Sequence, residues 1–318
     1  MDHELTLPLI EAARARIAAH VRRTPLARSA TLSRELETNI YLKLEVFQKT
    51  GAFKVRGAFN KMLPLPAGSR VVAVSGGNHA QAVAYAAGAL GMRARIYMPR
   101  STPANYLDAT RGYGAEIVLT AGHAESFAAA EVAAAEGWIM VHPFDDVEVM
   151  AGQGTLGLEI LDDVPGVSDV IVSIGGGGMA SGVAAAIKTR RPEARLWGVE
   201  TEGADAMAQA LLAGHPVRLA AITSIAKTLG APEVSLRTLA AVQLWFDSVT
   251  VVSDAEALAA GQFLLERAKV LTEPAASCTL AAARRLREQF TPASHVVLIL
   301  CGGNLALSDL CAWTAAAS

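Results

Sequence analysis

Short runs of β-branched and other apolar residues alternate along the chain with longer, alanine-rich stretches. Many of the apolar runs end at glycine, which is typical of the buried strands of a parallel sheet. The alanine-rich stretches have the composition of helices. The predicted segments, in chain order, are RVVAVSGG, HAQAVAYAAGALG, RARIYMP, a helix around Tyr106, AEIVLT, ESFAAAEVAAAEG, WIMVHP, SDVIVSIGGGG, MASGVAAAIKTRRP, ARLWGVE, DAMAQALLAG and SHVVLILCGGN.

This alternation of strand and helix predicts an α/β fold with doubly wound, mostly parallel sheets. The strands are numerous enough for two sheets. The segment at residues 142–157, HPFDDVEVMAGQGTLG, is interpreted as a connector between two alternating blocks.

Composition and charge narrow the classes of function. The 318 residues are 52% hydrophobic and 18% charged, enough to bury a sizeable core. The net charge of -2, without a basic run longer than two residues, disfavours nucleic acid and anionic membranes and favours a small molecule as partner. No segment approaches the roughly 20 apolar residues of a membrane span, and the start lacks the apolar run of a signal peptide. Cys278, Cys301 and Cys311 have no paired or metal-ligand spacing, which predicts a reduced, cytoplasmic protein.

Three predicted strands end in glycine-rich turns, and ligands of open α/β sheets bind at the carboxyl ends of strands. Four consecutive glycines exceed what a turn needs, and their N–H groups can converge on a phosphate. Their spacing fits neither the dinucleotide fingerprint nor a Walker loop. Each turn alone is equally explained as a tight turn. The turns are Ser75, Gly76, Gly77, Asn78 and His79; Gly175, Gly176, Gly177 and Gly178; and Cys301, Gly302, Gly303 and Asn304.

A single lysine lies in the glycine-flanked stretch GAFKVRG at residues 51–57, shortly after an alternating apolar run at residues 40–44. Considered one at a time, the remaining candidates also have ordinary structural explanations. These are a solvated charge for Lys54, a satisfied polar residue for His79, a helix-start carboxylate for Glu273, and core positions for Phe53 and Met179.

Taken together and in this order, the segments resemble the fold type II family of pyridoxal phosphate enzymes, the threonine/serine dehydratase and serine racemase group. The resemblance covers nearly the whole chain, and its specificity comes from the joint order of motifs. The motifs are RTPLARS, GAFKVRGA, SGGNHAQAVAYAA, YMPRSTPANYLDATRGYGAEIVL, GQGTLGLEI, GGGGMASG, GVETEGADA, ITSIAKTLG, TEPAASCTLAA and CGGN.

The resemblance implies two doubly wound, mostly parallel sheet domains, similar to the tryptophan synthase β chain, with the cofactor in the cleft between them. Residues 1–66 and 147–318 are expected to form the large cofactor-binding domain. Residues 67–146 are expected to form a small, mobile domain that receives the substrate carboxylate. A homodimer is also expected, because family members are often dimers.

For the site, the resemblance implies that Lys54 holds pyridoxal phosphate as an internal Schiff base and, once freed, removes the substrate's α-proton. Phe53 would cover one face of the ring, and Cys301 would face the pyridine nitrogen. The implied cofactor-binding residues are Phe53, Lys54, Asn78, Gly175, Gly176, Gly177, Gly178, Met179, Glu273, Cys301 and Gly302. The implied substrate-binding residues are Ser75, Gly76, Gly77, Asn78 and His79.

The implied reaction is β-elimination from an L-3-hydroxy amino acid, such as threonine or serine, to a 2-oxo acid and ammonia. A neutral thiol at Cys301 cannot keep the ring nitrogen protonated as a carboxylate would, which favours prompt loss of the β-substituent over a long-lived carbanion. The chain ends soon after CGGNLALSDLCAW, so a catabolic role without feedback control is expected.

Departures from the family pattern leave alternatives open. Gly76 stands where racemases have a serine, so racemisation should be weak, and the extra room could admit a bulkier substrate such as 3-phenylserine or 3-hydroxyaspartate. Ala52 replaces the serine usual before Phe53 and removes a hydroxyl near the phosphate. A β-replacement synthase, a nicotinamide-dependent dehydrogenase and a catalytically silent binding protein are the rival functions.

A cation site is also implied, in altered form. Glu200 and the carbonyl of Ala204 match family cation ligands, but Ala206 stands where magnesium-dependent members have an aspartate. One carboxylate with several carbonyls suits a monovalent cation such as potassium better than magnesium. The alternative is that Glu200 is a strand-end carboxylate paired with a nearby basic group.

Overall fold

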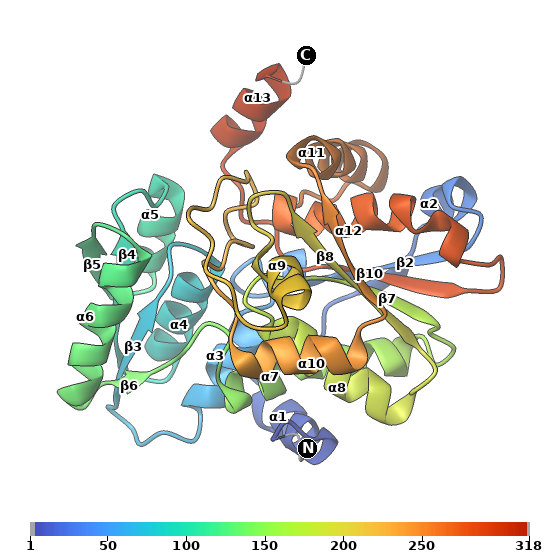
Figure 1. Ribbon diagram of the computed structural model, residues 1–318. Helices are drawn as coiled ribbons and strands as arrows, with labels where there is room; N and C mark the ends of the chain where they lie inside the picture. The colour runs from blue at the N-terminus through green and yellow to red at the C-terminus, as the bar shows by residue number, and fades with distance from the viewer. Residues whose placement is uncertain (1–3, 317–318) are drawn as a thin grey trace.

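The computed structural model describes residues 4–316 and contains two separate sheets, both built mainly from parallel strands (Figure 1). This confirms the predicted α/β fold. Residues 70–140 supply the smaller sheet, and the segments before and after them supply the larger one. The domain limits at residues 66 and 147 remain a prediction. No helix within residues 4–316 has the length and apolar character needed to cross a membrane.

The larger sheet has the strand order β1-β2-β10-β7-β8-β9, and only the β1–β2 pair is antiparallel. Strand β10 is buried on both faces, which explains its continuous apolar run. Val297 and Ile299 pack into one core cluster, whereas Val296 and Leu298 pack into another on the opposite face. The sequence prediction missed β1 and β9. The strands are β1 (Leu26–Arg28), β2 (Asn39–Leu44), β7 (Asp169–Ser173), β8 (Arg195–Thr201), β9 (Ser248–Val252) and β10 (His295–Leu300).

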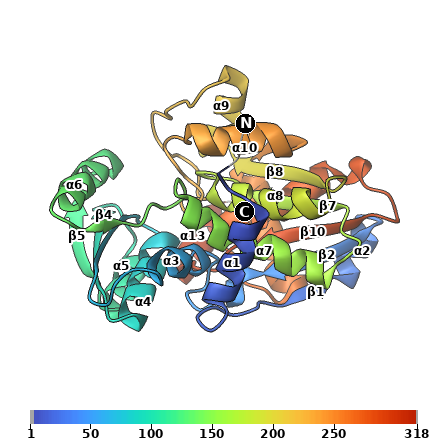
Figure 2. The ribbon, with the colours of Figure 1, turned by 90° about the horizontal axis from the view of Figure 1, so that it is seen from below.

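The smaller sheet has the order β5-β4-β3-β6, with all neighbours parallel. It forms the left part of the molecule in Figure 1, together with three helices that connect its strands, and the same separation is visible from below in Figure 2. All of these strands and helices were predicted. They are β3 (Arg70–Val74), α4 (Asn78–Ala89), β4 (Arg93–Pro99), α5 (Ala104–Gly112), β5 (Glu116–Thr120), α6 (His123–Ala135) and β6 (Ile139–Met140).

Helices cover both faces of the larger sheet. Residues of α7 and α8 pack into the core on one face, and residues of α2, α11 and α12 pack into the core on the other. Helix α13 projects from the top of the molecule in Figure 1. The helices outside the smaller sheet are α1 (Leu7–Ile17), α2 (Ala30–Glu35), η1 (Glu45–Phe47), α3 (Val55–Met62), α7 (Val147–Asp163), α8 (Gly178–Arg190), α9 (Ala206–Ala213), α10 (Leu236–Trp245), α11 (Asp254–Phe263), η2 (Leu264–Ala268), α12 (Pro274–Arg285), η3 (Arg287–Gln289) and α13 (Leu307–Ala316).

The expected connector at residues 142–157 is in fact mostly helix, because α7 begins at Val147. Its glycines allow neighbouring helices to approach closely. A Cβ on Gly152 would lie 2.6 Å from the carbonyl oxygen of Arg56, and a Cβ on Gly154 would lie 2.8 Å from the carbonyl oxygen of Gly182. Gly152 and Gly154, in the segment interpreted as a connector, are therefore packing residues of a buried helix.

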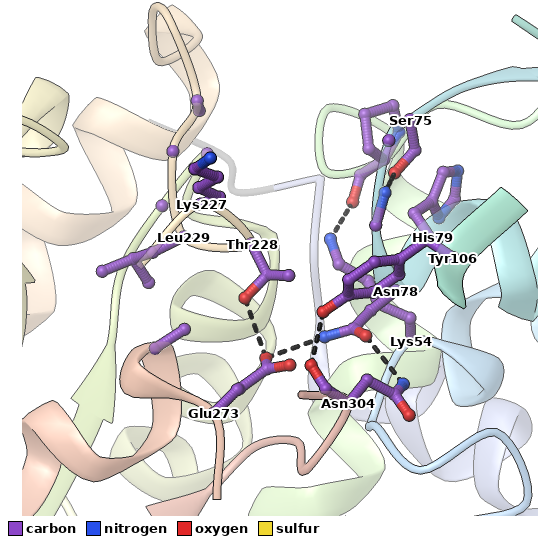
Figure 3. Close-up of a pocket in the computed structure, with 18 of the residues that line it drawn as sticks. Lys54, Ser75, Asn78, His79, Tyr106, Lys227, Thr228, Leu229, Glu273 and Asn304 are labelled. Atoms are coloured by element: carbon purple, nitrogen blue, oxygen red, sulfur yellow. Dashed lines mark hydrogen bonds between the residues drawn. The ribbon is translucent and has the colours of Figure 1, made fainter. Parts of the chain in front are cut away.

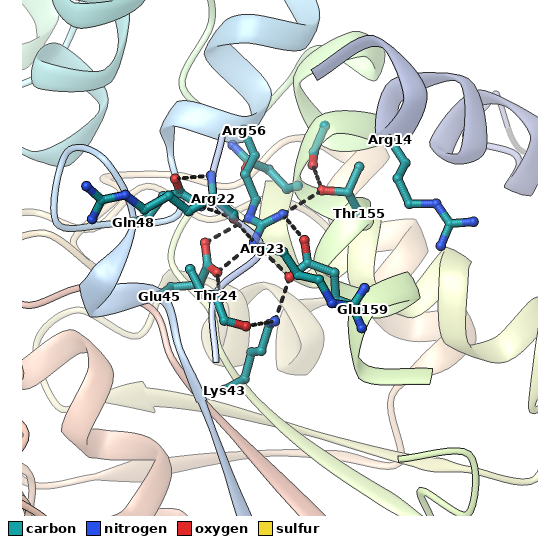
Figure 4. A network of polar contacts seen from close by, with 12 residues as sticks. Arg14, Arg22, Arg23, Thr24, Lys43, Glu45, Gln48, Arg56, Thr155 and Glu159 are labelled. Atoms are coloured by element: carbon teal, nitrogen blue, oxygen red, sulfur yellow. Dashed lines mark hydrogen bonds and ion pairs between the residues drawn. The ribbon is translucent and has the colours of Figure 1, made fainter. Parts of the chain in front are cut away.

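A buried group of charges connects the start of α3 to η1, α7 and β2 (Figure 4). The guanidinium of Arg56 donates to both oxygens of Glu45 and to both oxygens of Glu159, at 2.7 to 3.0 Å. Lys43 of β2 also pairs with Glu159 and donates to the carbonyl oxygen of Thr24 at 2.7 Å. Two cations and two anions thus neutralise one another, and one of them, Arg56, lies two residues after Lys54 in the chain.

Candidate active site

The three glycine-rich strand ends line one cavity of about 330 Å³, between the smaller and the larger sheet (Figure 3). This is where ligands bind in open parallel sheets. Gly302, Glu200, Ala204 and Ala206 are not among the lining residues. The predicted residues that line the cavity are Phe53, Lys54, Ser75, Gly76, Gly77, Asn78, His79, Gly175, Gly176, Gly177, Gly178, Met179, Glu273 and Cys301.

Lys54 directly precedes α3 and reaches into this cavity from the larger sheet. Its segment is fixed to the end of β10, since the Phe53 N–H donates to the carbonyl oxygen of Cys301 at 3.0 Å. Burial is the largest influence on Lys54 and lowers its pKa to about 8, although the nearby Glu273 carboxylate acts in the opposite direction. The Nζ donates to the carbonyl oxygen of Pro143 at 2.7 Å. A substantial fraction of neutral amine is therefore present near pH 8, as a nucleophile or base requires.

The four glycines after β7 form a cradle that side chains would fill. A Cβ on Gly175 would lie 2.1 Å from the carbonyl oxygen of Leu229, and a Cβ on Gly176 would lie 2.1 Å from the Phe144 ring. Gly177 has a φ of 91°, in the left-handed region that favours glycine. Because α8 begins at Gly178, the cradle lies at the positive end of a helix and suits a phosphate.

The Ser75–His79 turn lies at the start of α4, a second helix N-terminus facing the cavity. The Gly77 N–H donates to Ser75 Oγ at 3.0 Å, which orders the turn. Burial lowers the pKa of His79 to about 3, so its imidazole is neutral. Its Nε2 lies 2.8 Å from the carbonyl oxygen of Val141, which assigns the proton to that nitrogen. Backbone N–H groups and a helix end without a fixed negative charge suit a carboxylate.

A hydrogen-bonded chain connects the two sheets across the cavity floor (Figure 3). Asn78 Nδ2 and Thr228 Oγ1 donate to Glu273 Oε1 at 2.8 and 2.9 Å, and Asn304 Nδ2 donates to Asn78 Oδ1 at 2.8 Å. The Tyr106 hydroxyl donates to the carbonyl oxygen of Asn304. Burial raises the pKa of Glu273 to about 7, and its Oε2 has no partner among the described residues. A buried carboxylate with a free oxygen indicates that a ligand group belongs beside it.

Glu273 occupies the helix-start position that its sequence context predicted, immediately before α12. Its side chain nevertheless makes no cap hydrogen bond to that helix. The carboxylate is used instead for the chain of hydrogen bonds across the cavity floor.

Cys301 is a neutral thiol. Burial raises its pKa to about 12, and the Ser173 hydroxyl donates to its Sγ at 3.5 Å. The three cysteines Cys278, Cys301 and Cys311 are free, as their spacing predicted. The thiol can exchange a weak hydrogen bond with a group in the cavity but offers no negative charge.

The room expected beside Gly76 is taken up by Thr102, which the sequence analysis did not identify. The Thr102 Oγ1 lies 2.7 Å from the position that a Cβ on Gly76 would occupy. This hydroxyl is buried, lines the same cavity and has no hydrogen-bond partner among residues 4–316. The missing side chain at position 76 therefore gives no open space for a larger substrate at this point.

Gly76→Ala is expected to raise the KM for the amino-acid substrate about 10-fold, the effect of mild overpacking. Thr102 is β-branched and buried, so it has few conformations with which to yield. Steady-state kinetics of the single variant and of Gly76→Ala/Thr102→Ala measure the effect, and the double variant should recover most of the affinity. A single variant with unchanged KM would show that the two positions do not compete for space.

The proposed cation ligands do not meet in the cavity. Glu200 is buried and accepts the N–H groups of Met207 at 3.2 Å and Ala208 at 2.8 Å, at the start of α9. Burial raises the pKa of Glu200 well above its usual value. Its partners are thus backbone amides, not the basic group considered as an alternative. Within residues 4–316 no cluster of three or more acidic, histidine or cysteine side chains could hold a metal, and the monovalent site remains a prediction.

Phe144, Tyr106 and Thr228 contribute to the site but were not singled out from the sequence. Tyr106 and Thr228 lie within the motifs YMPRSTPANYLDATRGYGAEIVL and ITSIAKTLG, and Phe144 lies in the expected connector. A phenylalanine, a tyrosine or a threonine does not by its chemical type indicate a functional site. Only the three-dimensional packing of α5 and of the two loops that carry Phe144 and Thr228 brings these residues to the cavity.

Comparisons with known proteins agree with this geometry. The family model described as "Pyridoxal-phosphate dependent enzyme" matches residues 17–302. An L-threonine ammonia-lyase of Geobacter sulfurreducens is 41% identical over 95% of this chain and 76% of the relative. The catabolic L-threonine dehydratase TdcB of Staphylococcus aureus is 38% identical over 96% of this chain and 91% of the relative.

Solved structures with the same fold include two kinds of enzyme. Maize serine racemase has a TM-score of 0.91 and 36% identity, covering 98% of this chain and 97% of its own. A threonine deaminase from T.th. has a TM-score of 0.89 and 37% identity, covering 95% of this chain and 99% of its own.

Proposed function

This chain belongs to the pyridoxal-phosphate-dependent enzyme family, and from that premise we propose that it is an ammonia-lyase acting on an L-3-hydroxy amino acid such as threonine or serine. The observation that carries the proposal is the position of Lys54. Its amine, with a pKa of about 8, faces the same cavity as a phosphate cradle and a carboxylate-binding turn.

The residues present fit pyridoxal phosphate. The cradle at Gly175–Gly178 would hold the phosphate with backbone N–H groups, and any side chain there would close it. The unpartnered oxygen of Glu273 and the neutral thiol of Cys301 would lie against the ring. Asn78 would donate to the ring hydroxyl, and Phe53 would cover one face. When bound, the cofactor supplies an aldehyde for amines and a conjugated ring that delocalises the electron pair left by the α-proton.

The chain's own residues then perform three tasks. The N–H groups of the Ser75–His79 turn bind and orient the substrate carboxylate. The neutral Lys54 amine accepts the α-proton, the electron pair forms the new double bond, and the β carbon–oxygen bond breaks with loss of water. Because Cys301 is a neutral thiol, it would not stabilise a proton on the ring nitrogen, which would favour rapid loss of the hydroxyl. Addition of water to the product releases a 2-oxo acid and ammonia.

Release of 2-oxo acid and ammonia from L-threonine and L-serine, with pyridoxal phosphate bound, tests this function. L-threo-3-phenylserine and L-threo-3-hydroxyaspartate serve as bulkier comparators, and formation of D-serine measures racemisation. Faster turnover of threonine or serine than of the two comparators is expected. Absence of 2-oxo acid from all four amino acids would contradict the proposal.

We also propose a cytoplasmic homodimer. Leu307 is 74% exposed on the projecting helix α13, and the exposed Leu265 and Leu271 lie around the hollow between that helix and α11. Apolar side chains gathered on one surface favour association. Light scattering on the purified protein measures the oligomeric state directly.

Gly176→Ala is expected to weaken the binding of pyridoxal phosphate by about 10- to 100-fold, the range for overpacking a rigid site. The added Cβ would lie 2.1 Å from the Phe144 ring, inside the proposed phosphate cradle. Gly112→Ala in α5 is the matched control, because a Cβ there meets no atom within 4 Å. Fluorescence titration of the two apo-proteins with the cofactor compares them. Equal affinities would place the phosphate elsewhere.

A further inference from the structure

The chain that crosses from β6 to α7 touches the Lys54 amine with its backbone. The carbonyl oxygen of Pro143 accepts a hydrogen bond from Lys54 Nζ at 2.7 Å. A backbone carbonyl keeps this position only while the turn around it keeps its shape. What holds the turn therefore also controls where the lysine amine rests.

His142 closes this turn with one ring nitrogen. Its Nδ1 lies 2.7 Å from the backbone nitrogen of Asp145 and 3.3 Å from that of Phe144, and it accepts both N–H groups. The ring is wedged between two others, with centroids 4.7 Å from Phe144 and 5.7 Å from Phe127. Histidine is thus both the acceptor inside the turn and part of its apolar packing.

The imidazole can act as an acceptor because it is neutral. Burial lowers the pKa of His142 to about 4, and the charges that face it are Asp145, Asp146, Lys54 and Arg237. A proton on Nδ1 would replace acceptance of two N–H groups with repulsion. Near neutral pH the turn is therefore held in one state.

The same turn also supports the phosphate cradle. Phe144 places its ring 2.1 Å from the position of a Cβ on Gly176 and its backbone 2.8 Å from that of a Cβ on Gly178. One imidazole thus fixes two features of the site at once. The support of the phosphate cradle and the contact with Lys54 can be separated experimentally. A substitution changes the Phe144 ring but leaves the backbone oxygen of Pro143 in place.

We infer that His142 is a positioning residue for Lys54: by accepting the N–H groups of Phe144 and Asp145, it presents the Pro143 carbonyl to the lysine amine whenever that amine is not covalently bound. The amine is then held at one place in the cavity wall. The inference rests on the proposed function only in taking Lys54 as the reacting amine.

The hydrogen bond has a measurable consequence for the amine. A carbonyl oxygen stabilises the ammonium form more than the neutral form. Without this contact the ammonium form of Lys54 loses a hydrogen-bond acceptor, so the pKa of the amine should fall. The freed amine should also spend less time in the reactive position, which lowers kcat more than it changes KM.

The experiment compares His142→Leu, which removes the acceptor, with His142→Asn, whose Oδ1 takes the place of Nδ1. The rate of covalent attachment of pyridoxal phosphate to the apo-protein is measured against pH, and kcat and KM are measured for L-threonine. For His142→Leu we expect the pH midpoint of attachment to move down by about one pH unit and kcat to fall about 10-fold with little change in KM. His142→Asn should restore both.

A second variant separates the two roles of the turn. Phe144→Leu keeps the backbone N–H that His142 binds, so it should weaken cofactor binding without moving the pH midpoint. A shifted midpoint in Phe144→Leu would overturn the assignment to His142. So would wild-type behaviour of His142→Leu, or equal impairment of the Leu and Asn variants.

The test of His142 can still be interpreted if one variant does not fold or if the proposed function is wrong. If His142→Leu does not fold, His142→Asn is compared with His142→Gln, whose amide oxygen does not coincide with Nδ1, and equal behaviour of these two overturns the inference. Attachment to the apo-protein requires no amino-acid substrate. A wild-type protein inactive with threonine would therefore contradict the proposed function while leaving the test of His142 intact.

Discussion

Lys54→Ala is expected to abolish covalent attachment of pyridoxal phosphate and to lower the rate of 2-oxo acid formation by at least about 10²- to 10⁴-fold, the usual contribution of a positioned base. The amine is the group that Figure 3 shows pointing into the cavity, and burial already lowers its pKa to about 8. The visible absorbance of the purified variant and a coupled assay for 2-oxo acid provide the two measurements.

The matched control for this variant is Lys61→Ala on the same helix. Lys61 forms a partly exposed ion pair with Asp146 at 2.8 Å and lies away from the cavity lining. Because Lys61 does not line the cavity, the control should keep its absorbance and activity. A Lys54→Ala protein that still binds the cofactor covalently would show that another amine is the reactive one.

The strand ends of the site could be predicted because apolar runs and glycine turns depend on residues that are neighbours in the sequence. The apolar run of β10 and the turn from Cys301 to Asn304 follow from the sequence alone, and so do the glycines after β7. The structure adds that these turns line one cavity. Sequence order could suggest this, because the carboxyl ends of parallel strands meet at one edge, but it could not give a distance.

Other features depended on tertiary packing and could not be predicted. Residues 142–157 were interpreted as a connector, yet Gly152 in this segment lies inside α7 against the backbone of Arg56. Lys43 lies in the alternating run of β2, and nothing in that run indicates that it is fully buried beside Glu159. Thr102 carried no signal, because the space that it fills exists only once α5 and the Ser75–His79 turn are packed together. In each case the neighbour that decides the role is far away in the sequence.

Helix α3 connects the reacting lysine to the buried core of the protein. The helix begins one residue after Lys54, and Arg56 lies in its first turn. All four polar contacts from Arg56 to Glu45 and Glu159 are between buried side chains. An ion cluster that does not line the cavity therefore holds the helix that directly follows the reacting lysine.

Arg56→Leu is expected to destabilise the protein by about 3–5 kcal/mol, because removing one member of a buried ion cluster leaves the others uncompensated. Glu159 would then keep only Lys43 as a partner, and buried Glu45 would keep only the Thr24 hydroxyl. The thermal midpoint of the apo-protein should fall by on the order of 10 °C. Scanning calorimetry on the variant and the wild type measures both quantities.

Arg14→Leu is the control, because its ion pair with Asp162 is 41% exposed on the arginine side and should contribute no more than about 1 kcal/mol. Arg56→Lys keeps the charge but cannot donate to both carboxylates in parallel, so an intermediate midpoint is expected. If Arg56→Leu were as stable as Arg14→Leu, the buried charges would not hold α3, and the position of Lys54 would have to depend on other contacts, such as the backbone hydrogen bond between Phe53 and Cys301.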